Sequence, residues 1–156
     1  MKYRYVFLFV AIALVFLSII LLIDHEPSFF LPQKYDNFKK MCIMNETPDR
    51  YEAIYLGPKG NFSVIVYNFT TNESARNFYN NLVSVFYNQS VKHYNFSYNN
   101  VKLVKNVNEE MNFEKNDSYI ILILYRNYVI SLASDNVGRG TIVNFLQGNV
   151  NYLDHS

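Results

Sequence analysis

The chain has 156 residues and a formal net charge of +1, from 14 basic and 13 acidic residues. This balance leaves no basic stripe for a nucleic acid, so nucleic acid is excluded as an expected partner. Cys42 is the only cysteine, which excludes an intrachain disulfide and leaves the fold dependent on its hydrophobic core.

An apolar run of eighteen residues, 6–23, follows the basic segment 1–5 and has Ser18 as its one polar side chain. As a helix it would extend about 27 Å at ~1.5 Å per residue, close to the ~30 Å hydrocarbon core of a bilayer. No A-x-A-like triplet and no cysteine stand near its C-terminal end. The sequence therefore predicts a single-pass transmembrane signal anchor at 6–23, with a cleaved signal peptide or a buried soluble helix as alternatives.

The charges around this run predict its orientation. Lys2 and Arg4 precede it, whereas Asp24 and Glu26 follow it. The excess of basic residues on the cytoplasmic side of membrane spans places segment 1–5 in the cytoplasm and the remainder outside the cell membrane. We expect a linker at 24–33, where Pro27 disfavours helix continuation, and an extracytoplasmic domain at 34–156.

The density of N-glycosylation motifs also favours export. Asn-x-Ser/Thr occurs seven times, although the Asn, Ser and Thr content predicts about two by chance. Glycosylation requires an exported domain, so the protein is a glycoprotein candidate. The alternative is chance adjacency of loop residues. The candidate asparagines are Asn45, Asn61, Asn68, Asn72, Asn88, Asn95 and Asn116.

The exported part reads as alternating strands and helices. A weak element at 34–44 precedes strands at 50–56 and 61–69, and the capping-box pattern Thr70-x-x-Glu73 opens a helix to about 88. Further along we expect a strand at 100–107, a charged connection at 109–117, strands at 119–125 and 128–134, and a helix at 141–153. The order β-β-α-β-β-β-α predicts an α+β two-layer sandwich, a mainly antiparallel sheet with both helices on one face.

Three segments of this layout resemble small, uncharacterised membrane-anchored proteins of methanogenic archaea. They are Tyr-Glu-Ala-Ile-Tyr at 51–55, Val-Ile-Val-Tyr-Asn-Phe at 64–69, and Glu-Ser-Ala at 73–75 opening a helix. The resemblance covers roughly residues 30–153. It implies an exported α+β domain and brings no functional residues with it.

No motif supports catalysis. The three histidines, His25, His93 and His155, share no ligand spacing, and no catalytic, cofactor-binding or metal-binding residue is predicted. The segment 41–44, Met-Cys-Ile-Met, would suit Cu(I), although ordinary core packing explains it as well. The glycine pair around Arg139 would suit an anion at a helix start, or a plain loop.

The remaining feature is aromatic. If Tyr51, Tyr55 and Tyr67 line a sheet face free of helices, they form an amphipathic binding face; the alternative is that tyrosine simply favours strands. The sequence thus favours a membrane-tethered binding or structural module that contacts protein or glycan at the cell surface. An extracytoplasmic enzyme or soft-metal-handling protein is the alternative.

Overall fold

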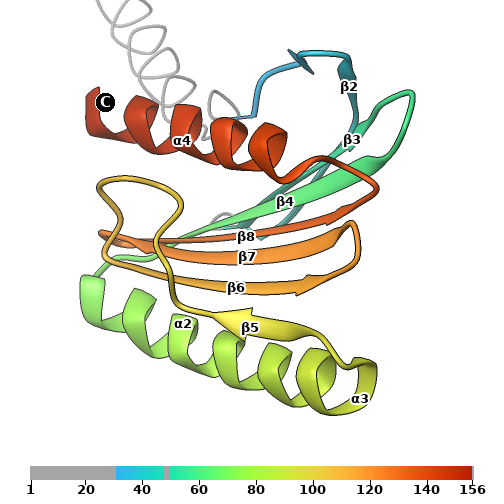
Figure 1. The fold of residues 1–156 in the computed structure, drawn as a ribbon. Helices are drawn as coiled ribbons and strands as arrows, with labels where there is room; N and C mark the ends of the chain where they lie inside the picture. The colour runs from blue at the N-terminus through green and yellow to red at the C-terminus, as the bar shows by residue number, and fades with distance from the viewer. Residues whose placement is uncertain (1–30, 48–49, 156) are drawn as a thin grey trace, which may run out of the picture.

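Residues 31–47 and 50–155, which the computed structural model describes, build an eight-stranded antiparallel sheet with a helix on each face (Figure 1). The strand order across the sheet is β1-β2-β3-β4-β8-β7-β6-β5. The strands are β1 (Lys34–Tyr35), β2 (Phe38–Thr47), β3 (Arg50–Leu56), β4 (Asn61–Asn68), β5 (Ser97–Asn99), β6 (Glu109–Lys115), β7 (Ser118–Tyr125) and β8 (Tyr128–Asp135).

Two long helices complete the fold. Helix α2 (Asn72–Phe86) continues through a π-helical turn (Tyr87–Val91) into α3 (Lys92–Tyr94), and α4 spans Arg139–His155. The predicted capping box is shifted by one residue: Thr71, in extended conformation, is the N-cap, and its Oγ1 accepts the N–H of Ser74 at 3.1 Å. Its hydroxyl therefore satisfies a backbone donor that the helix itself cannot pair.

Each face of the sheet has its own core. Beneath α4, which we call the α4-side core, Tyr55 and Phe62 stack at 4.7 Å, and Phe145 meets both rings edge-on at 5.3 and 5.0 Å. Beneath α2 lies the α2-side core, where Ala75 and Tyr79 pack on β6 to β8. Such aromatic contacts add to the stabilisation from burial alone.

The predicted two-layer sandwich with both helices on one face is wrong. In β7, Ile121 and Ile123 belong to the α4-side core, whereas Leu122 and Leu124 belong to the α2-side core. Because successive side chains of a strand point to opposite faces, a strand that is apolar on both sides needs cover on both. One helix on each face supplies it, which gives three layers (Figure 1).

Two predicted elements that precede β7 in the chain are also wrong. Residues 101–108 are a loop and not a strand, and the predicted charged connection contains β6. Strand β6 alternates polar Glu110, Asn112 and Glu114 with Met111 and Phe113, and the latter two belong to or pack against the α2-side core. The weak element at 34–44 is β1 and most of β2.

The predicted transmembrane anchor lies outside the described residues. Within residues 31–47 and 50–155, no helix is long and apolar enough to cross a bilayer. The end of the predicted linker is packed against the domain: Leu31 is buried in the α4-side core, and the carbonyl oxygen of Pro32 accepts the hydroxyl of Tyr55 at 2.8 Å.

Asparagine takes several of the turn positions that need a left-handed backbone. Asn95, Asn106, Asn116 and Asn136 have φ between 53° and 65°, and Asp36 and Arg126 have φ of 50° and 52°. Asparagine adopts this region more readily than most side chains. None of the described glycines has a positive φ.

Candidate functional site

A cavity of about 250 Å³, the α2–β6 pocket, lies between helix α2 and the beginning of strand β6. It forms because the β5–β6 ladder ends at the Asn99–Asn112 pair, so residues 109–111 continue at the sheet edge without β5 beside them. The loop 100–108 then turns over the opposite face, where Val104 and Val107 are buried in the α4-side core. A gap lined by helix, loop and strand edge results.

The lining combines three elements. Its residues are Tyr79, Asn80 and Val83 of α2, Asn100, Lys102 and Asn108 of the loop region, and Glu109, Glu110 and Met111 of β6. Sidechain amides, carboxylates, a phenol and an ammonium thus converge on a small space with apolar neighbours. Six of the nine lining residues have amide or charged side chains, and Val83, Met111 and the Tyr79 ring supply the apolar part, so the pocket is more polar than typical drug-sized sites.

Several of these polar groups are unused within the described part of the chain. Tyr79 is only 3 % exposed, yet its hydroxyl has no hydrogen-bond partner there. Asn80 and Asn100 likewise form no side-chain hydrogen bond with any described residue, and Glu109 has only a 3.6 Å ion pair with Arg76. The hydroxyl oxygen of Tyr79 is not among the fully buried unpartnered atoms, so it is accessible at the cavity and can bond a molecule that enters there.

Tyr79 is held in its neutral form. Burial raises the pKa of its phenol well above 10, and the nearby carboxylates of Glu109 and Glu110 raise that pKa further. A phenol with its ordinary pKa near 10 is already protonated at physiological pH, and the raised pKa extends that state to higher pH, so Tyr79 can donate a hydrogen bond into the pocket.

Two other lining groups are partly engaged. Lys102 Nζ donates to the carbonyl oxygen of Val107 at 3.0 Å, which leaves two of its protons for other acceptors. Asn108 Oδ1 accepts the N–H of Arg126 at 2.7 Å, so this amide is oriented with its NH₂ group unused by the described residues.

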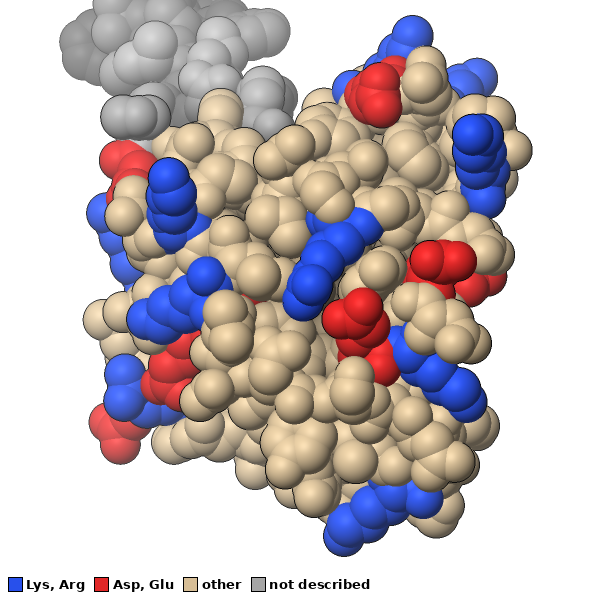
Figure 2. Space-filling view, viewed as in Figure 1, with Lys and Arg blue, Asp and Glu red and all other residues tan. Residues whose placement is uncertain are grey.

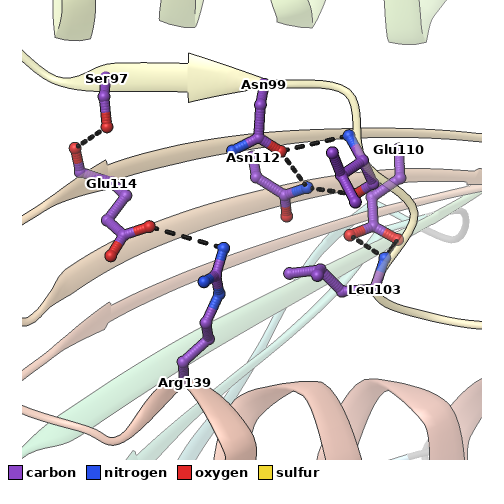
Figure 3. Close-up of polar contacts among 8 residues, drawn as sticks. Ser97, Asn99, Leu103, Glu110, Asn112, Glu114 and Arg139 are labelled. Carbon is purple, nitrogen blue, oxygen red and sulfur yellow. Dashed lines mark hydrogen bonds and ion pairs between the residues drawn. The ribbon is translucent and has the colours of Figure 1, made fainter.

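The wall of the pocket is fixed by the buried carboxylate of Glu110. Its oxygens accept the N–H of Leu103 at 3.0 and 3.1 Å (Figure 3). One of them also accepts the N–H of Val104 at 3.0 Å. Glu110 is 3 % exposed. A buried charge is tolerated when hydrogen bonds surround it, and here those bonds hold the loop on the sheet.

The same face of β6 continues with two further polar side chains (Figure 3). Asn112 Nδ2 donates to Val101 O at 2.8 Å and approaches Asn99 Oδ1 at 3.4 Å, whereas its Oδ1 is buried without a partner among the described residues. Glu114 pairs with Arg139 at 3.6 Å. These contacts join β5, β6 and the start of α4.

On the other flank of α2 a second cavity, the α2–β4 groove, has a volume of about 290 Å³. Tyr67, Phe69 and Phe78 line it, with ring centroids 4.6 and 5.1 Å apart, together with Asn68, Thr70 and Ser74. The side-chain amide of Asn68 in this groove is already hydrogen-bonded, since Asn127 Nδ2 donates to Asn68 Oδ1 at 2.9 Å. The groove is an aromatic surface with fewer unused polar groups.

The structure does not bring the three predicted tyrosines together. Tyr55 is fully buried in the α4-side core, and Tyr51 packs against that same core. Tyr67 lies on the opposite face and packs against the α2-side core. They therefore form no common exposed face, because their strand positions point them to different sides of the sheet.

Most predicted glycosylation sites lie on the surface. Asn61, Asn72, Asn88, Asn95 and Asn116 are exposed, and Asn68 is half-buried at the end of β4. Asn45 lies in β2, and its side chain is outside the described part. Occupancy of these sites stays a prediction.

The other described candidate residues from the sequence analysis lie in β2, at the start of α4, in α3 and at the end of α4. Cys42, Met41 and Met44 lie along β2, and Met41 is exposed. Gly138 and Arg139 do introduce a helix, but the Arg139 guanidinium is paired with Glu114. His93 is exposed in α3, His25 lies outside the described residues, and His155 ends α4. Among the described residues no three His, Cys, Asp or Glu side chains are grouped as metal ligands would be.

The sequence reasoning missed the residues of the α2–β6 pocket. Tyr79 lies within the helix that the sequence predicts to about 88, and Glu109 and Glu110 lie within the predicted charged connection at 109–117, so neither segment was a predicted site. The period-two alternation that begins at Glu110 was the available signal, since it identifies a strand with one polar face. Nothing in the sequence indicates that loop 100–108 crosses that face.

Charged side chains are mixed on the surface shown in Figure 2, where Lys and Arg alternate with Asp and Glu without a large patch of either sign. The ion pairs Arg76–Glu109 and Arg139–Glu114, both 3.6 Å, illustrate this mixing. Most of the visible face is uncharged.

The fold is similar to the crystal structure of a GTP binding regulator from Thermotoga maritima. The TM-score is 0.50 and the sequence identity 14 %, over 80 % of this chain and 84 % of that chain. At this identity the similarity concerns the fold alone. No family model and no curated protein matches the sequence. The resemblance to methanogen proteins stays a prediction.

Proposed function

We propose that this protein is a membrane-tethered binding module that holds a small polar ligand, outside the cell, in the α2–β6 pocket. The tether is the apolar run 6–23, and the flanking charges and the excess of glycosylation motifs support an outward-facing domain. The observation that carries the binding role is that polar side chains from α2, the loop 100–108 and β6, among them the largely buried Tyr79, line one cavity.

Binding is better supported than catalysis. The lining contains no serine, cysteine or histidine, and its tyrosine is neutral. Glu109 is paired with Arg76, and Glu110 is occupied by backbone N–H groups. A nucleophile within hydrogen-bonding reach of a base, which covalent hydrolysis needs, is not among these lining side chains.

The binding role is tested by blocking the pocket. Asn80 lines it from the exposed side of α2, and the adjacent Asn81 is exposed without lining it. The full chain, in sugar-free polyoxyethylene detergent, is screened against monosaccharides, amino acids, inorganic phosphate and GTP. GTP is included because the similar structure from Thermotoga maritima is that of a GTP binding regulator. Asn80→Phe should abolish binding of any hit, and Asn81→Phe should preserve it. Binding unaffected by Asn80→Phe, or no binding at all, would contradict the proposal.

The topology is tested separately. Protease added to intact cells or spheroplasts should digest residues beyond about 33 and leave the anchor. Full protection of the domain under an intact membrane would contradict the outward orientation.

A further inference from the structure

The residues that line the α2–β6 pocket indicate the chemical class of ligand that it can bind. This inference rests on the binding role proposed above. Charge is the first criterion. The Glu109 carboxylate is paired with Arg76, the Glu110 carboxylate accepts backbone N–H groups of the loop, and Lys102 Nζ donates to a backbone carbonyl. An ion entering the pocket would upset this arrangement, whereas a neutral ligand would not.

The unused groups differ in hydrogen-bonding sense. Tyr79 and Lys102 can donate, the Glu109 carboxylate can accept, and the amides of Asn80 and Asn100 can do both. A ligand group that satisfies such a mixed set must itself donate and accept. The hydroxyl group is the common neutral group with that property.

Size and the apolar part of the wall complete the description. The pocket volume of about 250 Å³ is slightly below the range of about 300–1,000 Å³ typical of drug-sized ligands, which indicates a single small ring. Val83, Met111 and the Tyr79 ring offer apolar contact for C–H groups of that ring.

We infer that the pocket binds a neutral, hydroxyl-rich ring, namely one monosaccharide unit, either as a free sugar or as the terminal unit of an oligosaccharide. The Tyr79 hydroxyl donates to a sugar oxygen, the Glu109 carboxylate accepts from a sugar hydroxyl, and the asparagine amides bridge neighbouring hydroxyls.

The experiment measures binding to the full chain in polyoxyethylene micelles, because detergents with sugar head groups would compete. Free glucose, galactose, mannose and N-acetylglucosamine form one arm, and oligosaccharides ending in the same units form the other. Saturation-transfer NMR detects the bound sugar, and titration gives its Kd. Binding in either arm supports the inference, and the comparison of the two arms identifies the source of the sugar.

The variants separate the roles of the groups. Tyr79→Phe keeps the ring and removes the hydroxyl, so sugar affinity should fall roughly three- to tenfold, as for one lost hydrogen bond. Tyr94→Phe is the matched control, since Tyr94 is exposed and outside the pocket. Glu109→Gln keeps an acceptor oxygen and should lower sugar affinity by less than about threefold, whereas an ammonium ligand would lose tenfold or more.

The outcomes distinguish the two levels of the proposal. If amino acids, phosphate or GTP bind in a manner that Asn80→Phe abolishes, while no sugar binds, the sugar inference is overturned and the binding role survives. If no probe of any class binds, both fall. An unchanged sugar affinity in Tyr79→Phe, with that variant folded as judged by its melting midpoint, also overturns the inference.

Discussion

Replacing Glu110 should release the loop that forms one wall of the α2–β6 pocket. The carboxylate is buried and accepts the N–H groups of Leu103 and Val104 at 3.0–3.1 Å. Val104 is fully buried. Glu110→Ala therefore removes the acceptor of two N–H groups and leaves at least one of them buried without a partner.

The cost follows from these bonds. A hydrogen bond to a charged group contributes roughly 1.5–3 kcal/mol, so two such bonds give an expected destabilisation of about 3–5 kcal/mol for Glu110→Ala. For a domain of this size that corresponds to a decrease of roughly 10 °C in the melting midpoint. Glu110→Gln retains one acceptor oxygen and should cost about 1 kcal/mol.

The assay is thermal unfolding of the full chain, followed by circular dichroism, together with amide hydrogen exchange at Leu103 and Val104. Glu114→Ala is the matched control, because Glu114 lies on the same strand and face but forms only a 3.6 Å pair with Arg139, both side chains being partly exposed. It should cost less than about 1 kcal/mol. Near-wild-type stability of Glu110→Ala, or unchanged exchange of the two amides, would refute the reasoning.

Three further results are expected. Tyr55→Phe, which loses the hydroxyl bound to Pro32 O, should cost about 1 kcal/mol, whereas Tyr55→Ser should cost ~3–5 kcal/mol by opening a cavity; equal melting midpoints would contradict this. Stability should fall as pH rises from about 10 to about 12: burial and the hydrogen bond to Asp154 raise the pKa of Tyr125 to about 12, so the folded state keeps a proton that the unfolded state loses. Tyr125→Phe should make that slope shallower, although the buried Tyr79, whose pKa is also raised, keeps part of it; an unchanged slope would count against the prediction. Native-host protein should exceed 18.4 kDa because of glycans, at the exposed sites foremost, and an intact mass equal to the bare polypeptide would remove that claim.

Much of the strand and helix pattern was predictable because it depends on local periodicity. The turn at Gly57–Gly60, the hairpin turn at Arg126–Asn127 and the apolar β7 have local signals, and the structure contains β3, β4, β7 and β8 near the expected bounds. The three-layer arrangement was not predicted, although the apolar sequence of β7 indicates it. A strand that is apolar on both faces requires cover on both faces.

The candidate site was less predictable because it depends on long-range contacts. Glu110 looks like a loop acid until loop 100–108 supplies its N–H partners. Tyr79 fits the apolar stripe of α2, and only the early end of the β5–β6 ladder leaves its hydroxyl facing a cavity. Neither the path of the loop across the sheet nor the point at which the β5–β6 pairing ends produces a periodic pattern in the sequence.

The left-handed asparagines determine how the glycosylation motifs should be removed in the laboratory. Asn95 and Asn116 are at once turn residues with φ of 57° and 53° and acceptor asparagines. The customary Gln substitution would force a longer side chain into a backbone region that costs ordinary residues roughly 1 kcal/mol or more. Glycine abolishes the acceptor and occupies this region freely. Asn→Gly at these two positions therefore separates loss of a glycan from loss of a turn, which Asn→Gln would confuse.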